Sequence, residues 1–227
     1  MSFIVKNTTF PGLLDLIAPY SCRGCGRIGE PLCKRCKNYI IASQHNFCPT
    51  CRQPIPTNGL CLKCKNPIPL FTIDKRDSLV GKLIHDYKYR SVRPLGLTFA
   101  EILNATLPNI PGLVAIAPLP TATHHVRQRA LDHTLLISKK LAKLRGTDYR
   151  VEKILSRAKN TVQVGSGRQS RLHQATLAYI TTKSANPNTT YILLDDVYTT
   201  GASMHAATKK LQQAGAKRII QVVLAIS

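Results

Sequence analysis

The sequence contains few acidic residues. Its 11 aspartates and glutamates stand against 32 lysines and arginines, which gives a formal net charge of +21. The shortage of acidic residues does not determine a fold, but it favours polyanionic partners and binding that weakens as salt rises. A solvated basic surface without such a partner explains the same balance, because a basic composition alone is a weak indicator of nucleic-acid binding.

Long apolar runs are also absent. No run approaches the roughly 18 residues that a membrane span needs. The first residues lack the continuous apolar core and the cleavage site of a secretory signal, since Lys6 and Pro11 interrupt them. We therefore expect a cytoplasmic protein without membrane insertion. The 227 residues leave room for one α/β domain of about 150 residues and a small appended module.

No cysteine follows position 64, and all eight cysteines are arranged as Cys-x-x-Cys pairs. The pairs are Cys22 and Cys25, Cys33 and Cys36, Cys48 and Cys51, and Cys61 and Cys64. Such a turn places two sulfurs on one side of a tight loop, and two turns complete a tetrahedral thiolate site. The sequence predicts two structural zinc ions, each held by four cysteines, in a zinc-binding module that spans residues 1–70.

Other uses of the cysteines are less consistent with the pattern. Disulfides require an oxidising compartment, and a redox Cys-x-x-Cys usually occurs once. Iron–sulfur clusters use the same ligands and remain an alternative. Pairing in sequence order joins the first two pairs and the last two, but the spacing also permits an interleaved pairing. Few apolar residues are present to form a core, so we expect metal binding to supply folding energy of order 10 kcal/mol per site.

The remaining residues show alternating strand and helix patterns. Prolines 54, 56, 67 and 69 predict a linker and a boundary near residue 70, which leaves residues 71–227 as a second domain. Strands alternating with helices predict a doubly wound α/β sheet. Apolar spacing predicts helices over 77–87, 95–107, 123–145 and 202–214, and strands over 113–117, 151–155, 176–180, 191–195 and 218–226.

The segment 191–204 has the pattern of a phosphate site. Asp195 and Asp196 follow a buried strand, at the end where open α/β sheets bind ligands. Residues 199–203 then lead into a helix, whose free N-terminal amides and partial positive charge suit a phosphate. Gly201 permits close backbone approach. An ordinary capped helix after a strand is the alternative.

This segment resembles the signature of type I phosphoribosyltransferases, which bind phosphoribosyl pyrophosphate (PRPP). The resemblance implies a type I phosphoribosyltransferase-like sheet. It also implies that Asp195 and Asp196 are the catalytic-site acids, which contact the ribose hydroxyls. The residues implied to hold the 5′-phosphate are Thr199, Thr200, Gly201, Ala202 and Ser203.

Nearly the whole chain resembles the ComF family, competence-associated proteins with a zinc finger before a phosphoribosyltransferase-like domain. The family usually has Pro-Val-Pro-Leu and Arg-Gly-Phe-Asn-Gln, where this chain has Ala-Pro-Leu-Pro at 117–120 and Arg-Ala-Leu-Asp-His at 129–133, which marks a divergent member. The segments that carry the resemblance are the cysteine module, Tyr87-Lys88-Tyr89, residues 116–120, Arg127, Arg129, Arg157, Asn160, Thr161, Gln163, Arg171 and the phosphate loop.

The resemblance also implies a pyrophosphate loop after the first core strand. It would comprise Pro118, Leu119 and Pro120, with Arg127 and Arg129 nearby. Lys88 and Arg90 could add positive charge. A solvated helix face explains Arg127 and Arg129 equally well. We interpret His124, His125 and His133 as surface residues, because no carboxylate lies at ligand spacing.

Two functions follow from these patterns. The ComF resemblance implies a protein of natural transformation that binds PRPP, with Mg²⁺, and single-stranded DNA, and works with a ComFA-like helicase. The alternative is an active phosphoribosyltransferase in nucleotide salvage or synthesis. Such enzymes select a base with a separate hood. Because the last predicted strand ends directly before Ser227, we expect no C-terminal hood, so residues 71–112, the cysteine module or a partner would have to serve.

Overall fold

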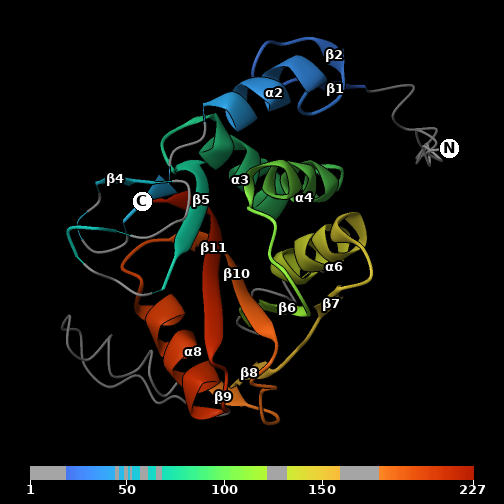
Figure 1. The fold of residues 1–227 in the computed structure, drawn as a ribbon. Coiled ribbons are helices and arrows are strands. Elements are labelled where there is room, and N and C mark those ends of the chain that lie inside the picture. The colour runs from blue at the N-terminus through green and yellow to red at the C-terminus, as the bar shows by residue number, and fades with distance from the viewer. Residues whose placement is uncertain are drawn as a thin grey trace, which may run out of the picture.

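A five-stranded parallel sheet lies at the centre of the computed structural model, which describes residues 19–43, 46–48, 51, 53–56, 61–64, 68–121, 132–158 and 179–227 (Figure 1). All four neighbouring strand pairs are parallel. The strands in spatial order are β5 (Leu70–Lys75), β11 (Arg218–Ile226), β10 (Thr190–Tyr198), β6 (Val114–Pro118) and β7 (Tyr149–Val151).

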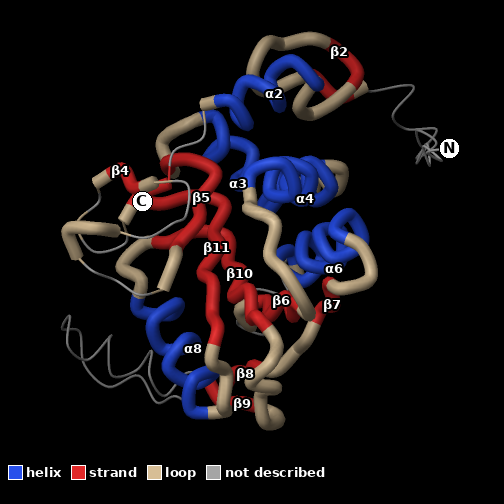
Figure 2. Tube along the Cα trace, in the orientation of Figure 1, coloured by secondary structure: helices blue, strands red, loops and turns tan. Residues whose placement is uncertain are grey.

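Helices cover both faces of this sheet (Figure 2). α3 (Leu79–Tyr89), α4 (Leu95–Thr106) and α6 (His133–Arg145) pack on one face, where Ile192 and Leu194 of β10 join their core. α8 (Ala202–Gln213) packs on the other face against Tyr191 and Leu193. Because side chains alternate along a strand, β10 contributes to both cores. The predicted α/β architecture is confirmed.

The expected elements mostly occur near their predicted positions. The final strand matches its predicted range, whereas β10 continues through both aspartates to Tyr198. No strand was predicted directly after the linker, but Leu70–Lys75 forms the edge strand β5. Residues 122–131 and 159–178 lie outside the described residues, so the starts of the predicted helix 123–145 and strand 176–180 fall there.

The predicted strand over residues 151–155 is wrong. β7 ends at Val151, and β8 (Leu155–Arg157) begins a separate antiparallel pair with β9 (Tyr179–Thr181). The carboxylate of Glu152, between the two strands, is buried and paired with Arg150 at 3.2 Å and with Lys183 at 3.1 Å. The alternation of residues along a strand does not predict these ion pairs of a buried carboxylate, which lie where the chain leaves the main sheet.

The first cysteine cluster packs against the helices of the main sheet. Its segment contains β1 (Tyr20–Ser21), β2 (Ile28–Gly29) and α2 (Lys34–Ala42). Leu32 and Ile40 are buried in the core formed by α3 and α4. Lys37 also pairs with Glu101 of α4 at 2.6 Å. The boundary near residue 70 stays a prediction, but a shared core crosses it.

The second cysteine segment contacts the sheet edge. It contains β3 (Asn46–Phe47) and β4 (Pro54–Ile55), and the Asn46 side chain accepts a hydrogen bond from the Thr72 amide of β5 at 3.2 Å. Among the described helices, none is long and apolar enough to cross a membrane.

Candidate functional site

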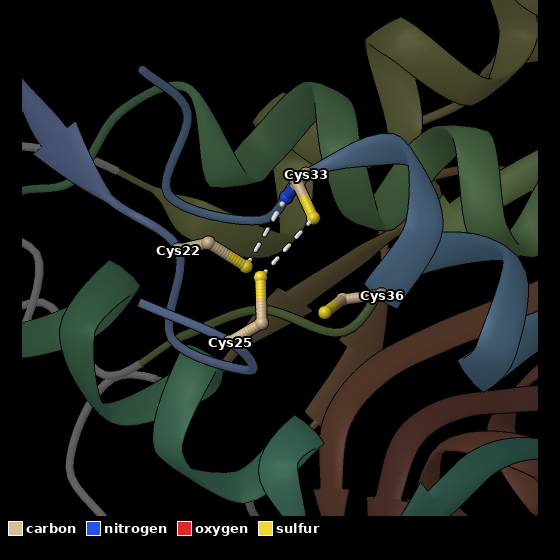
Figure 3. A group of neighbouring side chains, drawn as sticks. All are labelled: Cys22, Cys25, Cys33 and Cys36. Atoms are coloured by element: carbon tan, nitrogen blue, oxygen red, sulfur yellow. Dashed lines mark hydrogen bonds between the residues drawn. The ribbon is translucent and has the colours of Figure 1, made fainter. Parts of the chain in front are cut away.

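The eight cysteines form two separate clusters. The side chains of Cys22, Cys25, Cys33 and Cys36 gather in one place (Figure 3), and their sulfurs lie within 4.8 Å of one another. The sulfurs of the last four cysteines meet the same limit. Pairing therefore follows sequence order, and the interleaved alternative does not occur. The eight thiols are free rather than disulfide-bonded. In each cluster the cysteines thus converge on one point.

The cluster dimensions fit a tetrahedral metal ion. The Cys25 and Cys33 sulfurs are 3.7 Å apart, and the Cys51 and Cys61 sulfurs are also 3.7 Å apart. A tetrahedral zinc with bonds of about 2.3 Å places its sulfurs roughly 3.8 Å apart. The hydrogen bond with Cys51, followed by burial and the other thiols, raises the pKa of Cys64 to about 12, so a bound cation would have to displace the proton of this thiol. Both clusters could hold zinc.

The paired aspartates lie where the sheet topology changes direction. β6 leads through α6 to β7 on one side of the sheet, and β10 leads through α8 to β11 on the other. Open α/β sheets bind ligands at the carboxyl ends of strands at such a switch point. The Leu119 amide, just after β6, donates to the Leu194 carbonyl at 2.8 Å. This contact places residues 118–120 beside the start of the Asp195–Asp196 segment.

Asp195 and Asp196 point toward opposite faces, because they are consecutive on one strand. Asp196 pairs with Lys88 of α3 at 2.5 Å, and both side chains are mostly buried. Asp195 follows Tyr191 and Leu193, which face α8. The strand thus directs one carboxylate toward α3 and the other toward the α8 side.

The two carboxylates have unequal electrostatic environments. Burial, with the added repulsion of Asp196, raises the pKa of Asp195 to about 8. The Asp196 amide donates to Asp195 at 2.8 Å and opposes the rise, as do Lys88 and Arg157. Burial therefore favours the protonated form of Asp195, and a cation or a ligand donor would favour the carboxylate.

The stability advantage of the Asp195→Asn variant over the parent protein should grow as pH rises. The folded pKa of Asp195, about 8, exceeds the ordinary value of 3.8, so between these values the folded state holds a proton that the unfolded state has lost. Stability of the parent protein therefore falls with pH across this window. Thermal melting from pH 4 to 8 should show a growing advantage for Asp195→Asn. Asp148→Asn controls for removal of one exposed carboxylate, and an equal trend in both variants would contradict the assignment.

The loop after β10 makes a tight turn into α8. Gly201 precedes α8 with φ of +77°, which favours glycine. A Cβ at this position would lie 2.0 Å from the Tyr198 hydroxyl, so any other residue would also have to displace the Tyr198 ring. Thr199, Thr200 and Ser203 are exposed, and the first turn of α8 carries no acidic residue. The predicted phosphate residues are thus together at a helix N-terminus that suits an anion.

Arg157 and Tyr179 adjoin the same site, and spacing did not single them out. Arg157 Nε donates to the Pro120 carbonyl at 3.1 Å, and its guanidinium lies 5.4 Å from the centre of the Tyr179 ring. Burial raises the pKa of Tyr179, while Arg157 and a hydrogen bond with Ser203 oppose the rise. The β8–β9 pair therefore joins the predicted pyrophosphate loop to the phosphate loop. The sequence predicts a role for Arg157 only through the ComF resemblance, and no local sequence pattern identifies Tyr179.

Other predicted residues have varied outcomes. Lys88 reaches the aspartates, whereas Arg90 pairs with Asp86 at 3.5 Å. The interpretation of His133 as a surface residue is wrong, because it is buried with its ring 4.5 Å from that of Tyr87. Arg127, Arg129, His124, His125, Asn160, Thr161, Gln163 and Arg171 lie outside the described residues.

Comparison with known proteins gives one informative similarity. No family model matches the chain. The chain is similar to the competence protein ComFC of Bacillus subtilis (strain 168), with 23% identity over 202 residues, which cover 82% of this chain and 80% of that protein. The predicted resemblance to the ComF family is thereby confirmed over most of the chain.

Proposed function

We propose that this ComF-like protein binds PRPP or a related phosphoribosyl ligand at the loop after β10, and acts with single-stranded DNA in DNA uptake and natural transformation. One observation carries the ligand assignment: Asp195 and Asp196 lie near the carboxyl end of a buried strand, and the loop after this strand leads into a glycine-capped helix N-terminus. Hydrogen-bond acceptors for sugar hydroxyls thus lie beside donors for a phosphate. The similarity to a competence protein supports the cellular role.

The surrounding charges suit a ligand with a pyrophosphate group. Lys88 and Arg157 act on Asp195 from the two sides of the strand, and Arg157 also holds the Pro120 carbonyl. Mg²⁺ would neutralise pyrophosphate charge when bound with PRPP, and the carboxylates of Asp195 and Asp196 are the hard oxygen donors that this ion prefers. Zinc in the two cysteine clusters would be structural.

Single-stranded DNA is the proposed macromolecular ligand, because the chain carries a net charge of +21. We expect binding of an oligonucleotide to weaken steeply as salt rises, since each neutralised phosphate releases counterions. Fluorescence anisotropy across a salt series measures the slope. Binding that persists unchanged at high salt, or no binding at low salt, would exclude this part of the proposal. A ComFA-like helicase is the proposed protein partner, and the cytoplasm the proposed location.

An active phosphoribosyltransferase is the second candidate function. Two cations flank the paired carboxylates; the cations can stabilise a departing pyrophosphate, and the carboxylates can stabilise a cationic sugar. A PRPP-consumption assay across free bases, with and without single-stranded DNA, separates the candidates. Turnover with one base establishes the enzyme, whereas ligand and DNA binding without turnover supports the accessory role.

A further inference from the structure

A basic pocket lies along most of α3, between Arg23 of the first cysteine segment and Val197 near the end of β10. Its volume is about 480 Å³, within the range of small-molecule sites. Asp77 and Asp86 are the carboxylates at its wall. Five cations outnumber them, namely Arg23, Arg76, Lys82, Lys88 and Arg90. The pocket therefore suits an anion.

Asp86 organises one side of this pocket. Its side chain is buried and accepts a hydrogen bond from Arg23, which lies between Cys22 and Cys25 in the first cysteine cluster. Arg90 Nε lies 3.5 Å from the other carboxylate oxygen. One buried carboxylate thus anchors two cations from distant parts of the chain. A cationic side chain that is already fixed in place loses less conformational freedom when it binds an anion.

Two other cations of the pocket, Arg76 and Lys82, form no ion pair within the described part of the chain. Both side chains are exposed at the pocket. A phosphate bound here could therefore accept hydrogen bonds from two positively charged side chains that form no ion pair with a described carboxylate.

The pocket also offers an apolar and aromatic surface. Ile84 and Val197 line it, together with Tyr89, which is 62% exposed. The Tyr89 ring is tilted against that of His85, with centres 5.1 Å apart. Aromatic faces of this kind bind bases by stacking, without requiring a particular base. The lining therefore combines surfaces for a base and for a phosphate.

We propose that this pocket binds a nucleotide, with its phosphate at Arg76 and Lys82 and its base on the side of Tyr89. The nucleotide could be free or could be the terminal nucleotide of a DNA strand, because the chemistry is shared. The role of a nucleotide at this pocket rests on the proposed function of the protein with PRPP and single-stranded DNA. Lys88 lines the pocket and also pairs with Asp196, so a bound nucleotide would lie beside the phosphoribosyl ligand.

Titration of the zinc-loaded full chain without PRPP tests the pocket directly. At fixed ionic strength, adenosine 5′-monophosphate should bind, and adenosine should bind at least about tenfold more weakly. Arg76→Ala with Lys82→Ala should weaken binding of the monophosphate by about tenfold or more, because two charged donors are lost. The control, Lys139→Ala with Lys209→Ala, removes the same charge from exposed positions on α6 and α8 and should leave affinity unchanged.

Three results would overturn the inference: no binding of the monophosphate, equal binding of adenosine, or equal weakening in the control variant. Competition distinguishes the two sources of the nucleotide. A strand end is indicated if a 5′-phosphorylated oligonucleotide displaces the monophosphate better than its unphosphorylated form, and a free nucleotide if neither competes. PRPP binding should persist in the Arg76 and Lys82 variant, so failure of the pocket and failure of the PRPP site give different results.

Discussion

Asparagine at both Asp195 and Asp196 should weaken PRPP binding by about a hundredfold or more. Each carboxylate is expected to accept hydrogen bonds from the sugar, and a hydrogen bond to a charged group contributes about 1.5–3 kcal/mol. Neither substitution changes side-chain volume appreciably, so the strand and the glycine-capped helix should persist. Isothermal titration with PRPP and Mg²⁺ measures the loss, and far-ultraviolet circular dichroism checks the fold.

The Lys88 pair requires its own control in this experiment. Asp196→Asn leaves Lys88 without its partner, which lies 2.5 Å away in the parent protein. Lys88→Met separates loss of this ion pair from loss of the acceptor. If Lys88→Met abolishes PRPP binding while the double asparagine variant retains it, the aspartates are not the sugar acceptors.

Loss of the first cysteine cluster should destabilise the whole protein more than loss of the second. Cys22→Ser with Cys33→Ser should reduce bound zinc from two ions to one and lower the free energy of unfolding by more than about 4 kcal/mol, because loss of a metal is among the few local changes with effects that large. Both thiols are buried in the core that contains α3 and α4. Arg23 and Lys37 tie the same segment to these helices.

Cys48→Ser with Cys61→Ser is the matched variant. It should also retain one zinc ion, but it should leave unfolding of the α/β domain less affected, because the described contacts of this segment with the sheet centre on β3 and β5. Elemental analysis gives the metal content, and urea unfolding followed by near-ultraviolet circular dichroism gives the stability. Two retained ions in either variant, or equal destabilisation in both, would contradict this division of roles.

Local sequence patterns predicted the helices and strands that have a continuous run or regular spacing of apolar residues. Residues 218–226 form a strand because a nearly unbroken apolar run suits a sheet covered on both faces. Leu70–Lys75 was missed because prolines precede it and its polar end resembles a linker, whereas pairing with β11 determines its conformation. The cysteine pairing likewise depends on which turns meet in space, and the spacing alone permitted two answers.

At the candidate site, too, the local elements could be predicted from the sequence, whereas the contacts between distant residues could not. The order of Asp195, Asp196 and Gly201 predicts a strand, a tight turn and a helix N-terminus, all of which are present. The contacts of Lys88 with Asp196 and of Arg157 with Pro120 join residues far apart in sequence. Their geometry depends on how α3 and β8 pack around the sheet, which periodicity does not encode.

The most direct test is calorimetric titration of the zinc-loaded wild-type protein with PRPP in the presence of Mg²⁺. The proposal that residues 195–203 form a phosphoribosyl site predicts saturable binding of one PRPP per chain, which the Asp195→Asn and Asp196→Asn double variant loses. Absence of binding to the folded wild-type protein would contradict it, and so would equal binding to the double variant.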